Sequence, residues 1–262
     1  ILGIANVLLP VDALVFPLML LWMISGGLVF IPAAESFIAR SMLDLREPTD
    51  SEAGVVDAAW QEVAGSAGID ASRYSIWIET REDINSCLPG GRFLAVPRTI
   101  SRLPMRQQAA VLAHELSHHL GGHAWARLLV HWYAAPSRSV VRAYRASLRA
   151  VSGPIGCLSG AVLLLIGAIA LYAILTTPEA RPAIVALPLL PWLSRWAERR
   201  CDQVAADLGY GRDLLELFQW WQDSGFDEQR AGGVVRQVFS SHPTVANRIH
   251  ALRTYMTENG LT

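Results

Sequence analysis

Long uncharged runs of hydrophobic residues interrupt the periodic patterns of this chain. Residues 14–30 contain no charged side chain, and the uncharged stretch extends as far as Glu35. A second run, residues 157–175, consists of nineteen uncharged and mostly aliphatic residues. Because a helix needs roughly 20 apolar residues to cross a bilayer, both runs predict membrane-spanning helices.

A third apolar run, residues 183–193, follows soon after the second. It is too short for a helix of ~30 Å, but the sequence TPE at 177–179 is typical of a helix start and would lengthen it. We therefore expect a helical hairpin over residues 157–193, although its second arm could instead pack on protein or lie in the interface. Basic residues on both flanks, such as Arg149 and Arg195, predict that both ends lie in the cytoplasm.

Outside these runs, periodic patterns predict helices and two strands. Thr49 to Glu52 form a capping box, after which hydrophobic residues recur at helical spacing. Residues 74–79 and 92–96 are typical of strands, and the Pro-Gly-Gly turn between them leads us to expect a β-hairpin. Further helices are expected over residues 104–120, 124–133 with a stop at Pro136, 194–208, 212–223 and 244–257.

These patterns divide the chain into four parts. We expect an N-terminal transmembrane segment over residues 1–35 and the transmembrane hairpin over residues 151–193. The remaining parts, residues 36–150 and 194–262, would form one domain outside the bilayer. The expected fold class is mostly α with a small β-sheet (α+β), combined with transmembrane helices.

Composition agrees with a membrane-associated globular protein. Of the 262 residues, 52% are hydrophobic and 17% charged, whereas an ordinary soluble domain carries about 25% charged residues. This composition excludes fibrous and disordered classes. The net charge of −1 gives no support for nucleic-acid binding. The three cysteines form no metal-binding pair and no disulfide framework, so we expect a reducing compartment.

The sequence HELSH at 114–118 is the strongest chemical motif. His114 and His118 are four residues apart, so both imidazoles lie on one face of a helix and can reach one zinc ion. Glu115 lies one residue further round and can act as general base toward a zinc-bound water. The alternative is a helix that carries two surface histidines and no metal.

A catalytic zinc needs a third protein ligand. No Asp or Glu occurs between Glu115 and Glu179, and Glu179 would lie at the far end of the hairpin. Elimination therefore points to Glu198, on the same side of the membrane as the histidines. Asp202 follows four residues later and suits the role of acceptor for a ligand histidine N–H. The alternative for both acids is a solvated charged face.

Four segments resemble motifs of the HtpX and CAAX prenyl endopeptidase family of integral-membrane zinc proteases. The helix motif is VLAHELSHHLGGH at 111–123, and SRWAERRCDQVA at 194–205 resembles SRxxExxADxxA. In addition, NSCLPGG at 85–91 resembles NAFxxPGG, and SHPTVANRIHAL at 241–252 resembles SHPxxxxRIxxL. Cys201 replaces the usual alanine, and we assign it no role.

This resemblance implies a zincin-like fold and one Zn²⁺ per chain. His114, His118 and Glu198 would bind zinc, with Glu115 as general base. Residues 92–96 would line the substrate cleft and accept a peptide by β-augmentation. The resemblance further assigns Asn85 to substrate binding, and His242 and Arg248 to the developing oxyanion.

We therefore expect a membrane-bound zinc endopeptidase in a bacterial cytoplasmic membrane, with its active site facing the cytoplasm. Its expected partners are the lipid bilayer and a polypeptide substrate, which we expect to be a membrane protein. The oligomeric state stays open. The alternatives are a sensor-transducer that acts by limited cleavage, and a catalytically silent zinc-binding scaffold. The intact Glu115 argues against the scaffold.

Overall fold

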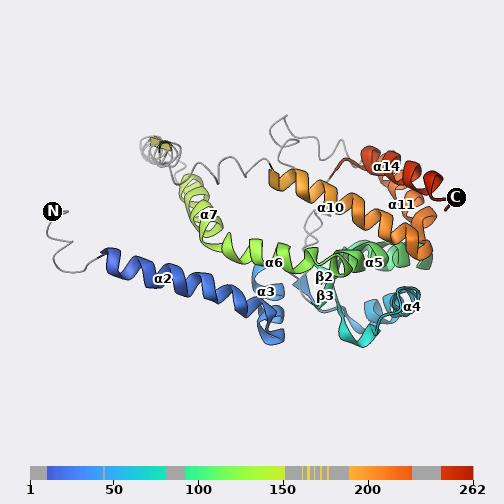
Figure 1. Ribbon diagram of the computed structural model, residues 1–262, viewed down its shortest axis with the longest axis horizontal. Coiled ribbons are helices and arrows are strands. Elements are labelled where there is room, and N and C mark those ends of the chain that lie inside the picture. The colour runs from blue at the N-terminus through green and yellow to red at the C-terminus, as the bar shows by residue number, and fades with distance from the viewer. Residues whose placement is uncertain are drawn as a thin grey trace.

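The computed structural model of the chain describes residues 11–43, 45–80, 92–150, 189–225 and 243–261, and the single positions 161, 164, 165, 168, 172 and 176. Helices predominate among these residues, and three short strands form one sheet (Figure 1). This confirms a mostly helical α+β fold. The expected hairpin over 157–193 falls largely outside the described residues, and so do Asn85 and His242. The four-part division of the chain stays a prediction.

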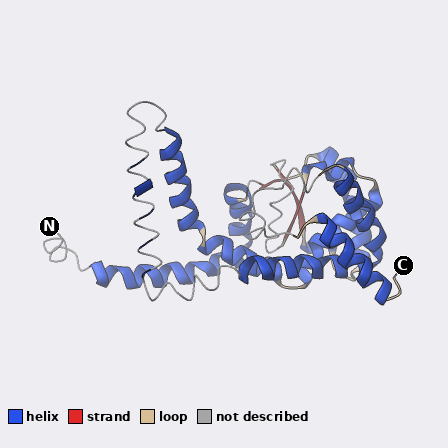
Figure 2. Ribbon diagram, turned by 90° about the horizontal axis from the view of Figure 1, so that it is seen from above, coloured by secondary structure: helices blue, strands red, loops and turns tan. Residues whose placement is uncertain are grey.

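The sheet has the strand order β1-β2-β3, with β1 at Leu45–Arg46, β2 at Ser75–Glu79 and β3 at Phe93–Val96. β1 pairs antiparallel with β2, whereas β2 and β3 run parallel. The expected β-hairpin is therefore wrong, although both of its strands exist. Parallel strands need a crossover of a dozen or more residues in place of a tight turn, and residues 80–92 are long enough to provide one. Figure 2 shows the sheet flanked by helices.

Helix α4 (Asp50–Ser66) begins at the predicted capping box. The Thr49 side chain accepts a hydrogen bond from the backbone N–H of Glu52, and the Glu52 side chain accepts one from the backbone N–H of Thr49. Val56, Trp60 and Val63 are buried, as the helical spacing predicted. They share a hydrophobic core with the sheet and α5, so α4 supports the helix that carries the histidines.

Three consecutive helices follow the sheet: α5 (Met105–Leu120), α6 (His123–Tyr133) and α7 (Ala135–Ala150). α5 is the central element of the fold, since every residue from 108 to 118 is buried. Pro136 was expected to stop the helical segment, but it lies at the second residue of α7. Proline is tolerated in a first helical turn because the backbone N–H groups there have no intrahelical partner.

The C-terminal part packs back onto α5. Helix α10 (Leu189–Ala205) continues through a π-helical turn (Ala206–Tyr210) into α11 (Gly211–Asp223). The last helix, α14 (Val245–Glu258), contacts both α10 and α11, while α10 contacts α5. Gly209 has φ 94°, a conformation that glycine adopts readily, and it lies where the chain turns from α10 into α11. This turn brings α5, α10 and α14 together around one buried region.

The N-terminal part begins with α2 (Val11–Ser25), followed by a 3₁₀ helix (Gly26–Phe30) and α3 (Pro32–Met42). The uncharged run that predicted one spanning helix is thus divided between two helical types at Gly26. α2 and α7 extend away from the part that contains the sheet (Figure 1). Among the residues that the structure describes, no helix combines the length and the apolar character needed to cross a membrane.

Aromatic side chains attach α2 to α6. Trp22 stacks on Trp132, with ring centroids 5.5 Å apart. The indole N–H of Trp132 donates to Ser25 Oγ at 3.0 Å, and the Tyr133 hydroxyl donates to the Met23 carbonyl at 2.6 Å. Since α6 follows α5 directly, the N-terminal helix is connected to the central helix of the fold.

Candidate metal centre

Helix α5 places the histidine motif in the interior of the protein. His114, Glu115 and His118 are all buried. The two imidazole rings lie 5.1 Å apart between centroids, as expected for positions i and i+4 on one helical face, and their planes are perpendicular. The histidines are therefore not surface residues, which removes the alternative of a solvated helix face.

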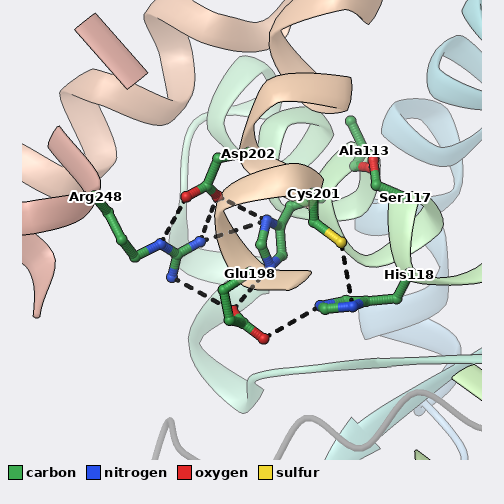
Figure 3. Close-up of polar contacts among 8 residues, drawn as sticks. Ala113, Ser117, His118, Glu198, Cys201, Asp202 and Arg248 are labelled. Carbon is green, nitrogen blue, oxygen red and sulfur yellow. Dashed lines mark hydrogen bonds and ion pairs between the residues drawn. The ribbon is translucent and has the colours of Figure 1, made fainter. Parts of the chain in front are cut away.

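Helix α10 supplies Glu198 opposite the histidines. Its two carboxylate oxygens lie 3.5 Å from Nε2 of His114 and 3.5 Å from Nε2 of His118 (Figure 3). One potential ligand atom from each of the three residues lies within 4.8 Å of the others, and no other such group occurs in the described part of the chain. The structure thus brings together the three residues expected to bind metal.

The donor set of this cluster fits zinc. Two imidazole nitrogens and one carboxylate oxygen are a known ligand set for catalytic zinc, which keeps its fourth position for water or substrate. The charges agree with this assignment, because the carboxyl groups of Glu115, Glu198 and Asp202 outnumber the single guanidinium of Arg248 in the buried region. A divalent cation would offset this excess of buried negative charge.

Asp202 lies behind His114 and fixes its orientation. Asp202 Oδ1 lies 2.9 Å from His114 Nδ1 and accepts a hydrogen bond from its N–H. Nε2 of His114 is consequently left to face Glu198 and the metal position, as the spacing of Glu198 and Asp202 predicted. Both carboxyl groups are buried, so they do not form a solvated charged face.

Arg248, from α14, holds Asp202 in place. Its Nε and Nη2 donate to the two oxygens of Asp202 at 2.9 and 2.5 Å, and Nη1 lies 4.0 Å from Glu198 Oε2. The guanidinium also lies over the ring of Phe218, 4.2 Å from its centroid. Nη2 lies 3.4 Å from His114 Nδ1, but that nitrogen carries the proton donated to Asp202 and cannot also accept one.

These contacts shift the pKa values of His114, Asp202 and Arg248. Burial favours neutral His114, but hydrogen bonds with Asp202 and Glu198 outweigh it and raise the pKa of His114 to about 9. Burial opposes ionisation of Asp202, but the charge of Arg248 and the bond to His114 lower its pKa. Burial likewise opposes the charge of Arg248, and the carboxylate of Asp202 outweighs this and raises its pKa. Asp202 and Arg248 are therefore both ionised at neutral pH.

The other predicted site residues have different outcomes. Arg248 was expected to face the developing oxyanion, whereas its guanidinium is bonded to Asp202; the oxyanion role stays a prediction. Asn85 and His242 lie outside the described residues. Strand β3 lies at the end of the sheet order and contacts α5, which places the expected substrate strand beside the histidine helix.

One contact of the site was missed by sequence analysis. Cys201 Sγ lies 3.2 Å from Nδ1 of His118, and both residues are buried (Figure 3). The spacing offered a clue, because Cys201 is three residues after Glu198 and so lies on nearly the same face of α10. Sequence analysis noted that Cys201 replaces the usual alanine and could approach the site, but it assigned the thiol no role.

Comparison with known proteins identifies the family. The model of peptidase family M48 matches residues 50–256, a range that includes α5, α10 and α14. No curated protein matches the chain significantly. The family match and the cluster of His114, His118 and Glu198 agree with each other: the chain belongs to peptidase family M48 and is a metallopeptidase.

Proposed function

We propose that this protein is a membrane-bound, zinc-dependent endopeptidase that hydrolyses peptide bonds of membrane proteins or peptides. The main support for the proposal is that the carboxylate of Glu198 lies 3.5 Å from Nε2 of both His114 and His118. Glu115 directly follows His114 in the same motif. Zinc held by these three ligands would supply a Lewis acid and lower the pKa of a water molecule to about 7.

Glu115 is the group that moves protons in this proposal. It follows His114 directly on α5 and lies in the same buried region. Its carboxylate would take a proton from the attacking water and deliver it to the amine of the leaving peptide. Asp202 and Arg248 would keep His114 in the tautomer that leaves Nε2 available.

Strand β3 is the proposed docking element for the substrate backbone. It forms an end of the described sheet and contacts the histidine helix α5. A peptide that pairs with a strand is held by main-chain hydrogen bonds, and only pockets beside the strand distinguish its side chains. This mode suits a peptidase that accepts many sequences.

Exposed apolar surface supports membrane attachment. On α2, Leu18, Leu21 and Ile24 have 61%, 64% and 66% of their surface exposed. Trp192 and Trp196 are also exposed at the beginning of α10, as in the aromatic belts of membrane proteins. Together with the uncharged run at 157–175, these features support an integral protein of a bacterial cytoplasmic membrane, and the flanking arginines support an active site facing the cytoplasm.

Casein cleavage by the purified 262-residue chain tests the proposed activity. We expect cleavage that disappears after treatment with 1,10-phenanthroline and returns when zinc is added in slight excess. The reason is that removing the ion removes the Lewis acid while leaving the peptide-binding residues in place. Cleavage that persists in the chelator, or that zinc fails to restore, would contradict the proposal.

A further inference from the structure

Side chains on one face of α10 lie at both ring nitrogens of His114 and of His118. Glu198, Cys201 and Asp202 are at positions i, i+3 and i+4, which lie together on a helical surface. Glu198 lies opposite the two Nε2 atoms, while Asp202 lies at Nδ1 of His114. Cys201 Sγ occupies the equivalent place at Nδ1 of His118, at 3.2 Å. Each histidine thus has a side chain of α10 at the nitrogen that faces away from the metal position.

We propose that Cys201 is a positioning residue that orients His118 for metal binding. In this inference the thiol sulfur accepts a hydrogen bond from Nδ1–H of His118, and so holds the ring with Nε2 toward Glu198. The inference rests on the proposed zinc site. It extends that site by a residue that would act through His118, with no contact of its own to the metal or the substrate.

The direction of this hydrogen bond follows from the chemistry of imidazole. A neutral histidine that binds a metal through Nε2 carries its proton on Nδ1, so Nδ1 is a donor. The partner at Nδ1 must therefore be an acceptor, and a thiol sulfur can accept weakly. Because Cys201 and His118 are both 1% exposed, bulk water does not compete strongly for this proton.

The two histidines would consequently be held with different strength. His114 donates to the ionised carboxylate of Asp202, which Arg248 supports with two hydrogen bonds. His118 donates to a neutral sulfur, a weaker acceptor than a carboxylate. We therefore expect Cys201 to contribute to zinc affinity at the lower end of the range measured for residues behind metal ligands, about tenfold.

The test compares zinc affinity in variants that keep or remove the acceptor. Cys201→Ala removes it and introduces the residue found in the motif that this segment resembles, so the variant is expected to fold. Cys201→Ser keeps an acceptor on the same carbon. Cys157→Ala removes a thiol elsewhere in the chain and is the control. The dissociation constant for zinc is measured by competition with a chelator, and the Tm of each zinc-free variant is measured alongside.

We expect Cys201→Ala to weaken zinc binding about tenfold, and Cys201→Ser to weaken it by less than about threefold. The control should bind zinc like the wild type. The zinc-free Tm values of the alanine and serine variants should be similar, because the hydrogen bond acts on the ring that binds metal and little on packing.

Three results would overturn the inference. They are unchanged affinity in Cys201→Ala, a loss in Cys201→Ser as large as that in Cys201→Ala, and an equal loss in the Cys157→Ala control. Failure of the proposed function is distinguishable from these, because the wild type itself would then bind no zinc at this site.

Discussion

The buried cluster depends on one ion pair that lies behind the metal position. Arg248 and Asp202 are joined by two hydrogen bonds, and both side chains are buried. Removing one partner of a buried pair leaves an uncompensated charge and is strongly destabilising. Arg248 therefore holds Asp202 in place and, through Asp202, also His114. This structural role is independent of any contact between Arg248 and an oxyanion. Loss of activity in an Arg248 variant has to be interpreted together with its stability.

The third ligand gives the sharpest prediction at the scale of single residues. Glu198→Ala is expected to lose bound zinc, because one of three protein ligands is removed from the cluster. Glu179→Ala is expected to retain about one zinc per chain, since the proposed topology places residue 179 across the membrane. Metal analysis of the two purified proteins decides between them. A zinc-free Glu179→Ala variant would refute both the ligand set and the hairpin topology.

At this site the sequence predicted which three candidate ligands come together better than it predicted the side chains that hold them in place. HELSH and the absence of acids before Glu179 were sufficient to select His114, His118 and Glu198. The partner of His118 was missed because a single cysteine in a motif carries no indication of what its sulfur touches. Likewise, no pattern showed that Arg248 binds Asp202, since the two residues lie on different helices and meet only when α14 packs on α10.

At the scale of elements, the N-terminus of α4 is stabilised by a charged capping interaction. The Glu52 carboxylate accepts hydrogen bonds from two nitrogens of Arg46, both at 2.7 Å, and from the backbone N–H of Thr49. The hydrogen bonds from Arg46 are the main cause that lowers the pKa of Glu52 to about 2. α4 supports α5 through the shared core, so this end of the fold affects the metal centre indirectly.

This lowered pKa predicts how the stability of the fold depends on pH. A carboxyl group with a depressed pKa stabilises the folded state above its unfolded pKa, near 4.5, and loses that contribution as pH falls toward 2. We expect Glu52→Gln to reduce the free energy of unfolding by about 1 kcal/mol at pH 7. The difference from wild type should shrink between pH 4.5 and 2, as urea denaturation at several pH values would show. A difference independent of pH would contradict this account of Glu52.

The strands show where sequence reasoning about elements reaches its limit. Weak alternation in residues 74–79, and the short hydrophobic run at 92–96 after the Pro-Gly-Gly sequence, located both strands to within one residue, because these are local features of the sequence. Their pairing depends on the path of the residues between them, and a Pro-Gly-Gly sequence can occur in a crossover as well as in a turn. The parallel register of Ile76 with Leu94 therefore could not be read from the pattern. Strand β1 is only two residues long, too short to give a periodic pattern.

At the scale of the whole molecule, the metal site imposes a constraint on topology. His114 and Glu198 must lie on the same side of any membrane, so the chain between α5 and α10 crosses it an even number of times. The uncharged run at 157–175 favours two crossings over none. In the topology that we propose, the basic residues on both flanks would put the site in the cytoplasm and the short connection near Glu179 outside.

Cysteine labelling tests this orientation. In a background with Cys87, Cys157 and Cys201 replaced by serine, Glu179→Cys should react with a membrane-impermeant maleimide added to intact spheroplasts. Arg145→Cys should react only after lysis, because it would lie on the cytoplasmic side. Labelling of position 145 before lysis would reverse the orientation. Protection of both positions would instead favour a re-entrant or interfacial segment.

The most direct test of the central claim compares wild type with Glu115→Gln for zinc content and casein cleavage, with Glu198→Ala as the blank for contaminating proteases. If His114, His118 and Glu198 bind zinc and Glu115 moves the proton, Glu115→Gln retains about one zinc per chain. Its cleavage rate should fall by about 10² to 10⁴-fold. Turnover comparable to wild type, or loss of zinc from Glu115→Gln, would contradict the account.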